Sequence, residues 1–207
     1  MGVEIERKFL VDPEKLAKIT QSKYWRKKAK HMVSSFAYFK IQGEDKISQI
    51  RVSHVQGKKC KLNAKGNLDH YTRPEWESEI DESTATDIIA NAKYVMHRTR
   101  HKIKINGLIW NVDELIDKYK GIYLAEIEIP EENFPIIYLP CISVEVTNDP
   151  TFYYSNLATT TSAIKIKGIH NKYKHLLELY SDRNYWPERE ITDVFEKKKK
   201  KEADFDD

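Results

Sequence analysis

The chain has 207 residues, of which 40% are hydrophobic and 32% are charged. No stretch approaches the roughly 18 consecutive apolar residues of a membrane-spanning helix, which excludes a membrane protein. The 4 Trp, 12 Tyr and 7 Phe can build a core, which excludes a chain that is disordered throughout. The net charge of +3, from 35 basic and 32 acidic residues, is a weaker bias than dedicated nucleic-acid binders usually show. Cys60 and Cys141 show no metal-site spacing and follow no secretory signal, so we expect reduced thiols in the cytoplasm.

Apolar and polar residues alternate with a period of two in many segments, which is typical of β-strands. Asn106-Gly107, between two of these segments, is a strong signal for a two-residue hairpin turn. Helical spacing is rarer and predicts helices over residues 13–20, 83–94 and 171–180. The segments predicted as strands are 3–11, 36–42, 47–56, 58–65, 72–80, 97–105, 108–115, 121–129 and 141–147.

Ionisable residues gather on one face of several predicted strands. Side chains alternate across a strand, so Glu4, Glu6 and Lys8 share one face, and Glu126 and Glu128 share one face of their own strand. Any single row of this kind is usually a solvated sheet face. Surface strands tend to mix signs, however, because like charges on neighbouring positions repel. The other rows are Lys59-Lys61-Asn63-Lys65, Arg73-Glu75-Glu77-Glu79 and Arg98-Arg100-Lys102-Lys104.

Closing about eight strands into a barrel would place all of these rows in one lumen. A lumen lined by charge must stay wet and hold a charged ligand. Carboxylate oxygens suit Mg²⁺ or Mn²⁺, and Arg and Lys suit phosphates, so a metal-bound polyphosphate satisfies both kinds of row. We therefore expect an α+β, mostly β fold: an eight-stranded antiparallel closed tunnel or barrel with a charged lumen and helices packed outside.

The segment Glu4-Ile5-Glu6-Arg7-Lys8 resembles the ExExK signature of the CYTH, or triphosphate tunnel metalloenzyme, superfamily. Further family-like blocks follow in order up to about residue 160. They are Ile50-Arg51-Val52, a strand ending at Lys65, Arg73-x-Glu75-x-Glu77, Arg98-Thr99-Arg100, Asn111-Val112-Asp113, Leu124-Ala125-Glu126-Ile127-Glu128, Val144-Glu145-Val146-Thr147-Asn148-Asp149 and Tyr154-Ser155-Asn156-Leu157-Ala158. The resemblance implies a tunnel domain over residues 1–160. We expect a helical extension packed on it over 161–195 and a disordered charged tail over 196–207.

The resemblance also implies a role for each charged row. Lys8, Tyr38 and Glu145 would assist catalysis, Tyr38 because some relatives carry a tyrosine there that partners the motif lysine. The metal, Mg²⁺ or Mn²⁺, would be bound by Glu4, Glu6, Glu126 and Glu128, and Asp113 and Glu145 would support it or a metal-bound water. The triphosphate oxygens would be bound by Lys8, Arg51, Lys65, Arg98 and Arg100, while Arg73 either adds to this set or neutralises Glu75 and Glu77.

Two positions depart from the family pattern. Ser53 stands where relatives often carry a second basic residue after Arg51, and Thr151 follows Asp149-Pro150 where many members are basic. The departure at Ser53 removes one contact from the implied phosphate site. The residues that are candidates to compensate are Lys61, Lys102 and Lys104.

The implied function is divalent-metal-dependent hydrolysis of a small-molecule triphosphate, either inorganic tripolyphosphate or an organic triphosphate such as a nucleotide or thiamine triphosphate. A class IV-type adenylyl cyclase shares the implied fold, but no base-reading motif is visible. An RNA 5′-triphosphatase is a third alternative, although the modest net charge disfavours a long nucleic-acid partner. A non-catalytic polyphosphate-binding module would need the basic rows but not four metal carboxylates. We expect a monomer or a homodimer.

Overall fold

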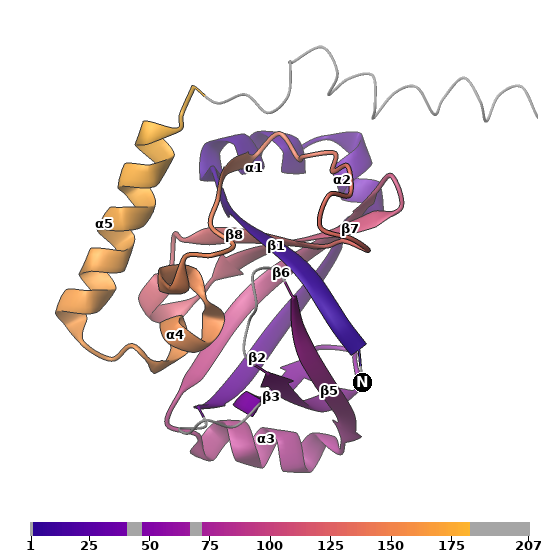
Figure 1. Ribbon diagram of the computed structural model, residues 1–207, viewed down its shortest axis with the longest axis vertical. Coiled ribbons are helices and arrows are strands. Elements are labelled where there is room, and N and C mark those ends of the chain that lie inside the picture. The colour runs from indigo at the N-terminus through magenta and orange to yellow at the C-terminus, as the bar shows by residue number, and fades with distance from the viewer. Residues whose placement is uncertain (1, 41–46, 67–71, 183–207) are drawn as a thin grey trace, which may run out of the picture.

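The computed structural model describes residues 2–40, 47–66 and 72–182, and it describes only the backbone of residues 2–4, 47, 48, 72 and 73. The tail expected over 196–207 lies outside these residues. Within the described ranges, nine strands form one antiparallel sheet (Figure 1). The strands are β1 Gly2–Val11, β2 Lys30–Lys40, β3 Ile47–Val55, β4 Cys60–Gly66, β5 Thr72–Ile80, β6 Val95–Ile105, β7 Leu108–Leu115, β8 Tyr123–Glu128 and β9 Ile142–Glu145.

The helices confirm two of the expected segments closely and add others. Helix α1 begins where predicted because the Asp12 side chain accepts hydrogen bonds from the backbone N–H groups of Glu14 and Lys15. Helices α2 and α4 were not predicted, since each is only one to two turns long and carries no full apolar stripe. The helices are α1 Pro13–Thr20, α2 Lys23–Lys28, α3 Glu82–Asn91, α4 Tyr154–Thr159 and α5 Ala163–Leu179, with 3₁₀ turns η1 Asp117–Tyr119 and η2 Pro150–Phe152. None of the helices in the described ranges is long and apolar enough to cross a membrane.

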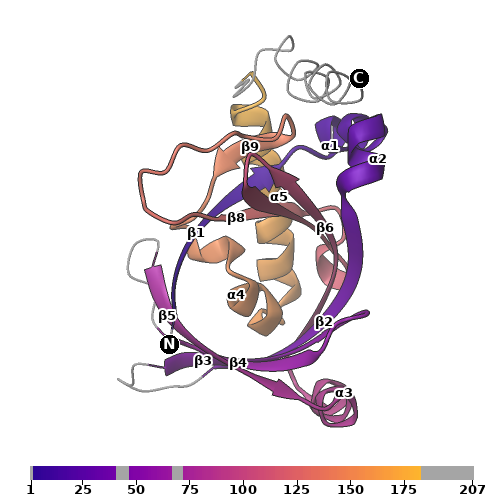
Figure 2. The same cartoon turned by 90° about the vertical axis from the view of Figure 1, so that its right-hand side faces the viewer.

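The order of the strands is β5-β4-β3-β2-β6-β7-β8-β1-β9, and β1 also pairs with β5. Seen end-on, the strands follow one another around a ring (Figure 2). Phe9 pairs with Ala125 of β8 and with Glu145 of β9, so β8 and β9 lie on opposite edges of β1. All nine segments predicted as strands form; eight of them match the expected eight-stranded count, and the short β9 adds to the edge of β1 beyond its pairing with β5.

The register of the strands brings the charged rows onto one face of the sheet. Lys8 lies opposite Glu126, and Glu126 lies opposite Asn111 on its other edge. Residues directly opposite each other in an antiparallel pair point to the same side. Following this rule around the sheet places the charged rows of β1, β3, β4, β5, β6, β7 and β8 on the same side, which we call the inward face. The pairs of opposite residues that link these strands in turn are Lys102 with Asn111, Lys30 with Lys102, Tyr38 with Arg51, Arg51 with Asn63, and Lys65 with Glu75.

Apolar residues cover the outer face and one end of the inward face. Helices α1 and α2 contribute Leu16 and Trp25 to a cluster with Phe9, Trp110 and Ile127, and α3 covers a smaller cluster on the outer face. The helices α1, α2 and α3 therefore pack outside, as expected.

Helix α4 corrects the expectation that all helices pack outside. The inward residues Leu10, Phe36 and Leu124 belong to one apolar cluster with Leu157 of α4. In the end-on view α4 and α5 lie across the ring rather than around it (Figure 2). The reason is that the inward face is apolar at this end and needs a cover, since exposed apolar area costs free energy. Helix α5 adds Ile169 and Tyr173 to the same apolar cluster, and the Tyr173 hydroxyl donates to the Val11 carbonyl of β1 at 2.6 Å.

Candidate active site

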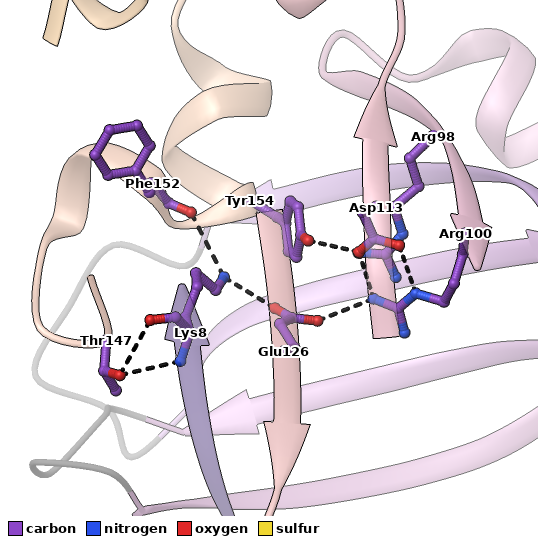
Figure 3. Close-up of polar contacts among 8 residues, drawn as sticks. All are labelled: Lys8, Arg98, Arg100, Asp113, Glu126, Thr147, Phe152 and Tyr154. Atoms are coloured by element: carbon purple, nitrogen blue, oxygen red, sulfur yellow. Dashed lines mark hydrogen bonds and ion pairs between the residues drawn. The ribbon is translucent and has the colours of Figure 1, made fainter. Parts of the chain in front are cut away.

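Five charged side chains form an alternating network at the centre of the inward face (Figure 3). Lys8 Nζ lies 2.9 Å from Glu126 Oε1, and Arg100 Nη2 lies 2.9 Å from Glu126 Oε2. Arg100 also holds Asp113 in a bidentate pair, with both donor–acceptor distances at 2.6 Å. Arg98 Nη1 completes the network at 2.9 Å from Asp113 Oδ2. The four strands β1, β8, β7 and β6 thus meet through charge-assisted contacts, the strongest class of hydrogen bond.

The network keeps its carboxylates ionised although they are buried. Burial alone would raise the pKa of Glu126, but Lys8, Arg100 and Arg98 lower it well below its ordinary value. Burial would likewise raise the pKa of Asp113, but Arg100 and Arg98 lower it. Both carboxylates therefore remain negative at neutral pH.

Both carboxylate oxygens of Asp113 accept hydrogen bonds in this arrangement. Its side chain is 0% exposed, and it accepts from Arg100, Arg98 and the hydroxyl of Tyr154, which lies 2.5 Å from Oδ2. The structure places Asp113 as the partner of the two arginines. The resemblance to the family had implied a place beside the metal for this residue.

The carboxylates Glu6 and Glu126 are the described pair whose chemistry fits a divalent cation. Their side chains are hydrogen-bonded to one another, and Glu6 lies opposite Glu128 in the β1–β8 ladder. Two carboxyl groups in contact are stabilised by a shared proton or by nearby cations, and a divalent cation is one such group. Carboxylate oxygens are the ligands that Mg²⁺ and Mn²⁺ prefer. Among the described side chains no three acidic, His or Cys residues converge as a metal site, and the Glu4 side chain is not among them.

A second group of charges lies on β3, β4 and β5. Lys65 Nζ lies 3.0 Å from Glu75 Oε2, Arg51 Nη2 lies 3.8 Å from Glu75 Oε1, and Asn63 donates to both Glu75 and Glu77 at 2.8 Å. The acidic row of β5 is thus neutralised by the basic row of β4 and by Arg51. Arg73 lies opposite Glu4 in the β1–β5 ladder, but its side chain is outside the described set.

Three buried donors on the inward face have no acceptor among the described residues. They are the Tyr38 hydroxyl, Arg51 Nε and Arg98 Nε. The Phe36 ring lies near both arginines, 5.5 Å from Arg51 Cζ and 4.4 Å from Arg98 Cζ, so the three donors gather over β2. Burial raises the pKa of Tyr38, so its hydroxyl keeps its proton and can donate. A buried donor without an acceptor costs about 1–3 kcal/mol, so this cluster fits an anion that supplies oxygens.

Glu145 does not join the carboxylates of the inward face. It lies opposite Phe9, on the other side of β1 from Lys8, and it forms a bidentate pair with Arg7, in which Arg7 Nε lies 2.9 Å from Glu145 Oε1. Thr147 Oγ1 also donates to Glu145 at 2.6 Å and accepts from the backbone N–H of Lys8 at 3.0 Å. Thr147 therefore links Glu145 to the backbone of Lys8, not to its side chain.

Replacing Glu145 by Gln is expected to lower the free energy of unfolding by about 1 kcal/mol at pH 7. Burial alone would raise the pKa of Glu145, but hydrogen bonds from Arg7 and Thr147 lower it. A carboxylate with a lowered pKa stabilises the fold above its unfolded-state pKa, and this contribution is lost as the pH falls through the folded-state value. Urea unfolding should therefore show a difference that is full at pH 7, begins to shrink near the ordinary value of 4.5, and vanishes at lower pH. A difference that is the same at pH 7 and pH 3 would contradict this assignment.

Tyr154 is the residue that the sequence patterns missed. It sits in a family-like block, but its segment shows no helical or strand period, and no role was implied for it. In the structure its hydroxyl contacts Asp113, and its ring lies 4.1 Å from Lys8 Nζ and 4.6 Å from Arg98 Cζ (Figure 3). Only the fold of η2 and α4 brings it beside these residues.

The lysines that were candidates to compensate for Ser53 have different surroundings. Lys61 is paired with Glu77, whereas Lys102 lies opposite Asn111 on the inward face. Burial and the nearby cations Arg100, Lys58 and Lys30 lower the pKa of Lys102. A surplus of positive charge therefore surrounds Lys102.

Known proteins resemble this chain in sequence and in fold. It is 32% identical over 159 residues to the inorganic triphosphatase of Acetivibrio thermocellus, an alignment that covers 76% of this chain and 94% of that protein. Its fold is similar to the crystal structure of the inorganic triphosphatase NE1496, with a TM-score of 0.54 and 22% identity over 79% of this chain and 99% of the other. A second crystal structure of NE1496 gives a TM-score of 0.53, also at 22% identity, over 77% of this chain and 99% of the other.

No protein-family model matches the chain. The chain is, however, 32% identical to the A. thermocellus protein over 94% of that protein's length, which is too extensive a similarity to arise by chance. The ExExK segment of β1 and the charged inward face agree with that relationship. The chain therefore belongs to the CYTH, or triphosphate tunnel metalloenzyme, superfamily.

Proposed function

We propose that this protein hydrolyses a small-molecule triphosphate with the help of Mg²⁺ or Mn²⁺. The observation that carries the proposal is the set of buried donors without acceptors, Tyr38, Arg51 and Arg98, beside the hydrogen-bonded carboxyls of Glu6 and Glu126. An anion rich in oxygens satisfies the donors, and a divalent cation satisfies the carboxyls. The inorganic triphosphatase activity named for the A. thermocellus relative supports the same reading.

We further propose that the sheet closes into a tunnel around this site. The pairing of Gly2–Ile5 in β1 with β5 supports closure, because β5 and β1 stand at opposite ends of the strand order before β9 is added. Closure would place the charged rows of β1 and of β3 to β8 around one space. The low effective dielectric constant of an enclosed protein site strengthens each electrostatic contact with a bound phosphate.

Each charged row then has a chemical task. The metal would be held by Glu4, Glu6, Glu126 and Glu128, and when bound it supplies charge neutralisation and lowers the pKa of a water. The triphosphate oxygens would be bound by Lys8, Arg51, Lys65, Arg98 and Arg100, with Arg73 beside them and a hydrogen bond from Tyr38. Asp113 would orient Arg98 and Arg100, and Glu145 would act indirectly through Thr147.

The carboxylates of the inward face hold the Lys and Arg side chains in place. Lys8 and Arg100 contact Glu126, and Lys65 and Arg51 contact Glu75. A triphosphate would exchange these contacts for its own oxygens, so the cations need no large movement. Preformed charges of this kind stabilise the charge that develops during phosphoryl transfer.

A ³¹P NMR time course with Mg²⁺ or Mn²⁺, offering tripolyphosphate and ATP separately, tests the proposal. We expect tripolyphosphate to yield orthophosphate and pyrophosphate, and the reaction to stop when EDTA is added. Pyrophosphate and cyclic AMP from ATP would assign a cyclase instead. Shifted resonances with no product from either compound would assign a binding module.

We propose a cytoplasmic location, because Cys60 and Cys141 are free buried thiols that suit a reducing compartment. We also propose that the tunnel domain spans residues 1–160 and that α5 belongs to an extension packed against it. The hydrogen bond from His170 to the Lys118 carbonyl, at 2.9 Å, supports this packing.

A further inference from the structure

Tyr154, the first residue of α4, lies where the apolar and charged parts of the inward face meet. Its side chain belongs to the apolar cluster at the α4 end, and the residue is only 7% exposed. Its hydroxyl points the other way and donates to Asp113 Oδ2 at 2.5 Å (Figure 3). One side chain therefore joins the cover of the inward face to the charged network.

Two cations of the proposed phosphate site rest against the ring of Tyr154. Lys8 Nζ lies 4.1 Å from the ring centroid, and Arg98 Cζ lies 4.6 Å from it. Lys8 comes from β1 and Arg98 from β6, and both are almost fully buried. Cation–π attraction is stronger where water is excluded, so the ring orders both cations at once.

The chain that leads into α4 holds Lys8 as well. The backbone N–H of Lys8 donates to Thr147 Oγ1 at 3.0 Å, and the N–H of Val146 donates to the Lys8 carbonyl at 2.8 Å. Lys8 Nζ also lies 3.5 Å from the carbonyl oxygen of Phe152, two residues before Tyr154. The segment from Thr147 to Tyr154 thus surrounds Lys8 on its backbone and on its ammonium group.

We propose that Tyr154 is a positioning residue whose ring aims Lys8 and Arg98 at the triphosphate. The hydroxyl fixes the ring through Asp113, which itself holds Arg98 and Arg100. The ring then sets the direction of both cations. This inference rests on the proposed triphosphate site.

Ring-free variants test the inference. We expect Tyr154→Leu to weaken the binding of tripolyphosphate, measured by calorimetry in EDTA so that no turnover occurs, by about tenfold. The KM with Mg²⁺ should rise by a similar factor. Tyr154→Phe keeps the ring and should stay within about threefold of wild type. Tyr154→Met, whose unbranched and flexible side chain can fill the space of the ring differently, serves if the Leu variant does not fold.

Tyr119→Leu is the matched control. Tyr119 is a buried tyrosine of the same apolar cluster, and its hydroxyl donates to the Leu157 carbonyl of α4 at 3.1 Å. Its cationic neighbour is Lys118 rather than Lys8 or Arg98. We expect this variant to lower the Tm like Tyr154→Leu while keeping the wild-type KM. Equal losses of tripolyphosphate binding in the two variants, or wild-type binding in Tyr154→Leu, would overturn the inference.

A chemical readout separates this inference from the proposed function. Reductive methylation with mass spectrometry reports how accessible the Lys8 amine is in the ligand-free protein. Lys8 should react faster in Tyr154→Leu than in wild type or Tyr119→Leu. If the wild type neither binds nor hydrolyses tripolyphosphate, the proposed function fails, and these rates alone decide: faster reaction in Tyr154→Leu supports the positioning role, and equal rates overturn it.

Discussion

Replacing Glu6 by Gln is expected to abolish metal-dependent hydrolysis of tripolyphosphate, with a loss of at least ~10³-fold in kcat. Gln keeps the size of the side chain but removes the charge that a divalent cation needs. The metal-free fold should be at least as stable as wild type, because the contact between Glu6 and Glu126 no longer joins two acids. Steady-state kinetics measure the loss of turnover, urea unfolding in EDTA measures the stability, and calorimetry with Mn²⁺ shows whether metal binding is weakened.

Glu114→Gln is the matched control for this prediction. Glu114 follows Asp113 on β7 and therefore points to the outer face, where it accepts a hydrogen bond from the Tyr123 hydroxyl at 3.1 Å. The Glu114→Gln substitution should leave the affinity for Mn²⁺ and the rate of turnover near wild type. Normal turnover in Glu6→Gln would remove Glu6 from the metal site and with it the main support for the proposed chemistry.

The strands and their charged rows follow from local pattern, which explains why they were predictable. Alternation with a period of two assigns each residue to a face without knowledge of the partner strand. Glu126 and Lys8 were therefore placed on rows that the register later brought opposite one another. The start of β2 at Lys30 was missed because residues 30–35 are mostly polar on both faces and are held by pairing with β6.

The remaining features depend on contacts between distant segments. Glu145 lies on the outer side because the short β9 pairs with β1 in one particular register, across an irregularity between Phe9 and Val11. Asp113 is enclosed by arginines because three strands and α4 meet at one point. Tyr154 reaches the network because η2 turns the chain back across the end of the sheet. None of these contacts leaves a periodic signal in the sequence.

Arg98→Lys is the second change from which we expect a large effect. The Arg98 guanidinium lies between the rings of Phe36 and Tyr154, at 4.4 and 4.6 Å, with Nη1 beside Asp113 and Nε without a partner among the described residues. This geometry lets one flat group contact Asp113 and a phosphate oxygen together. An ammonium group keeps the charge but loses the planar fork and the stacking.

We therefore expect Arg98→Lys to lower kcat/KM for tripolyphosphate by about 10²-fold while the affinity for Mn²⁺ stays near wild type. Arg26→Lys, an exposed arginine of α2, makes the same chemical change away from the inward face and should have no effect. The combination of lost turnover and retained metal binding would separate the phosphate-binding cations from the metal-binding carboxylates. Wild-type kinetics in Arg98→Lys would show instead that the charge alone matters at this position, and that the unpartnered Nε does not mark a phosphate contact.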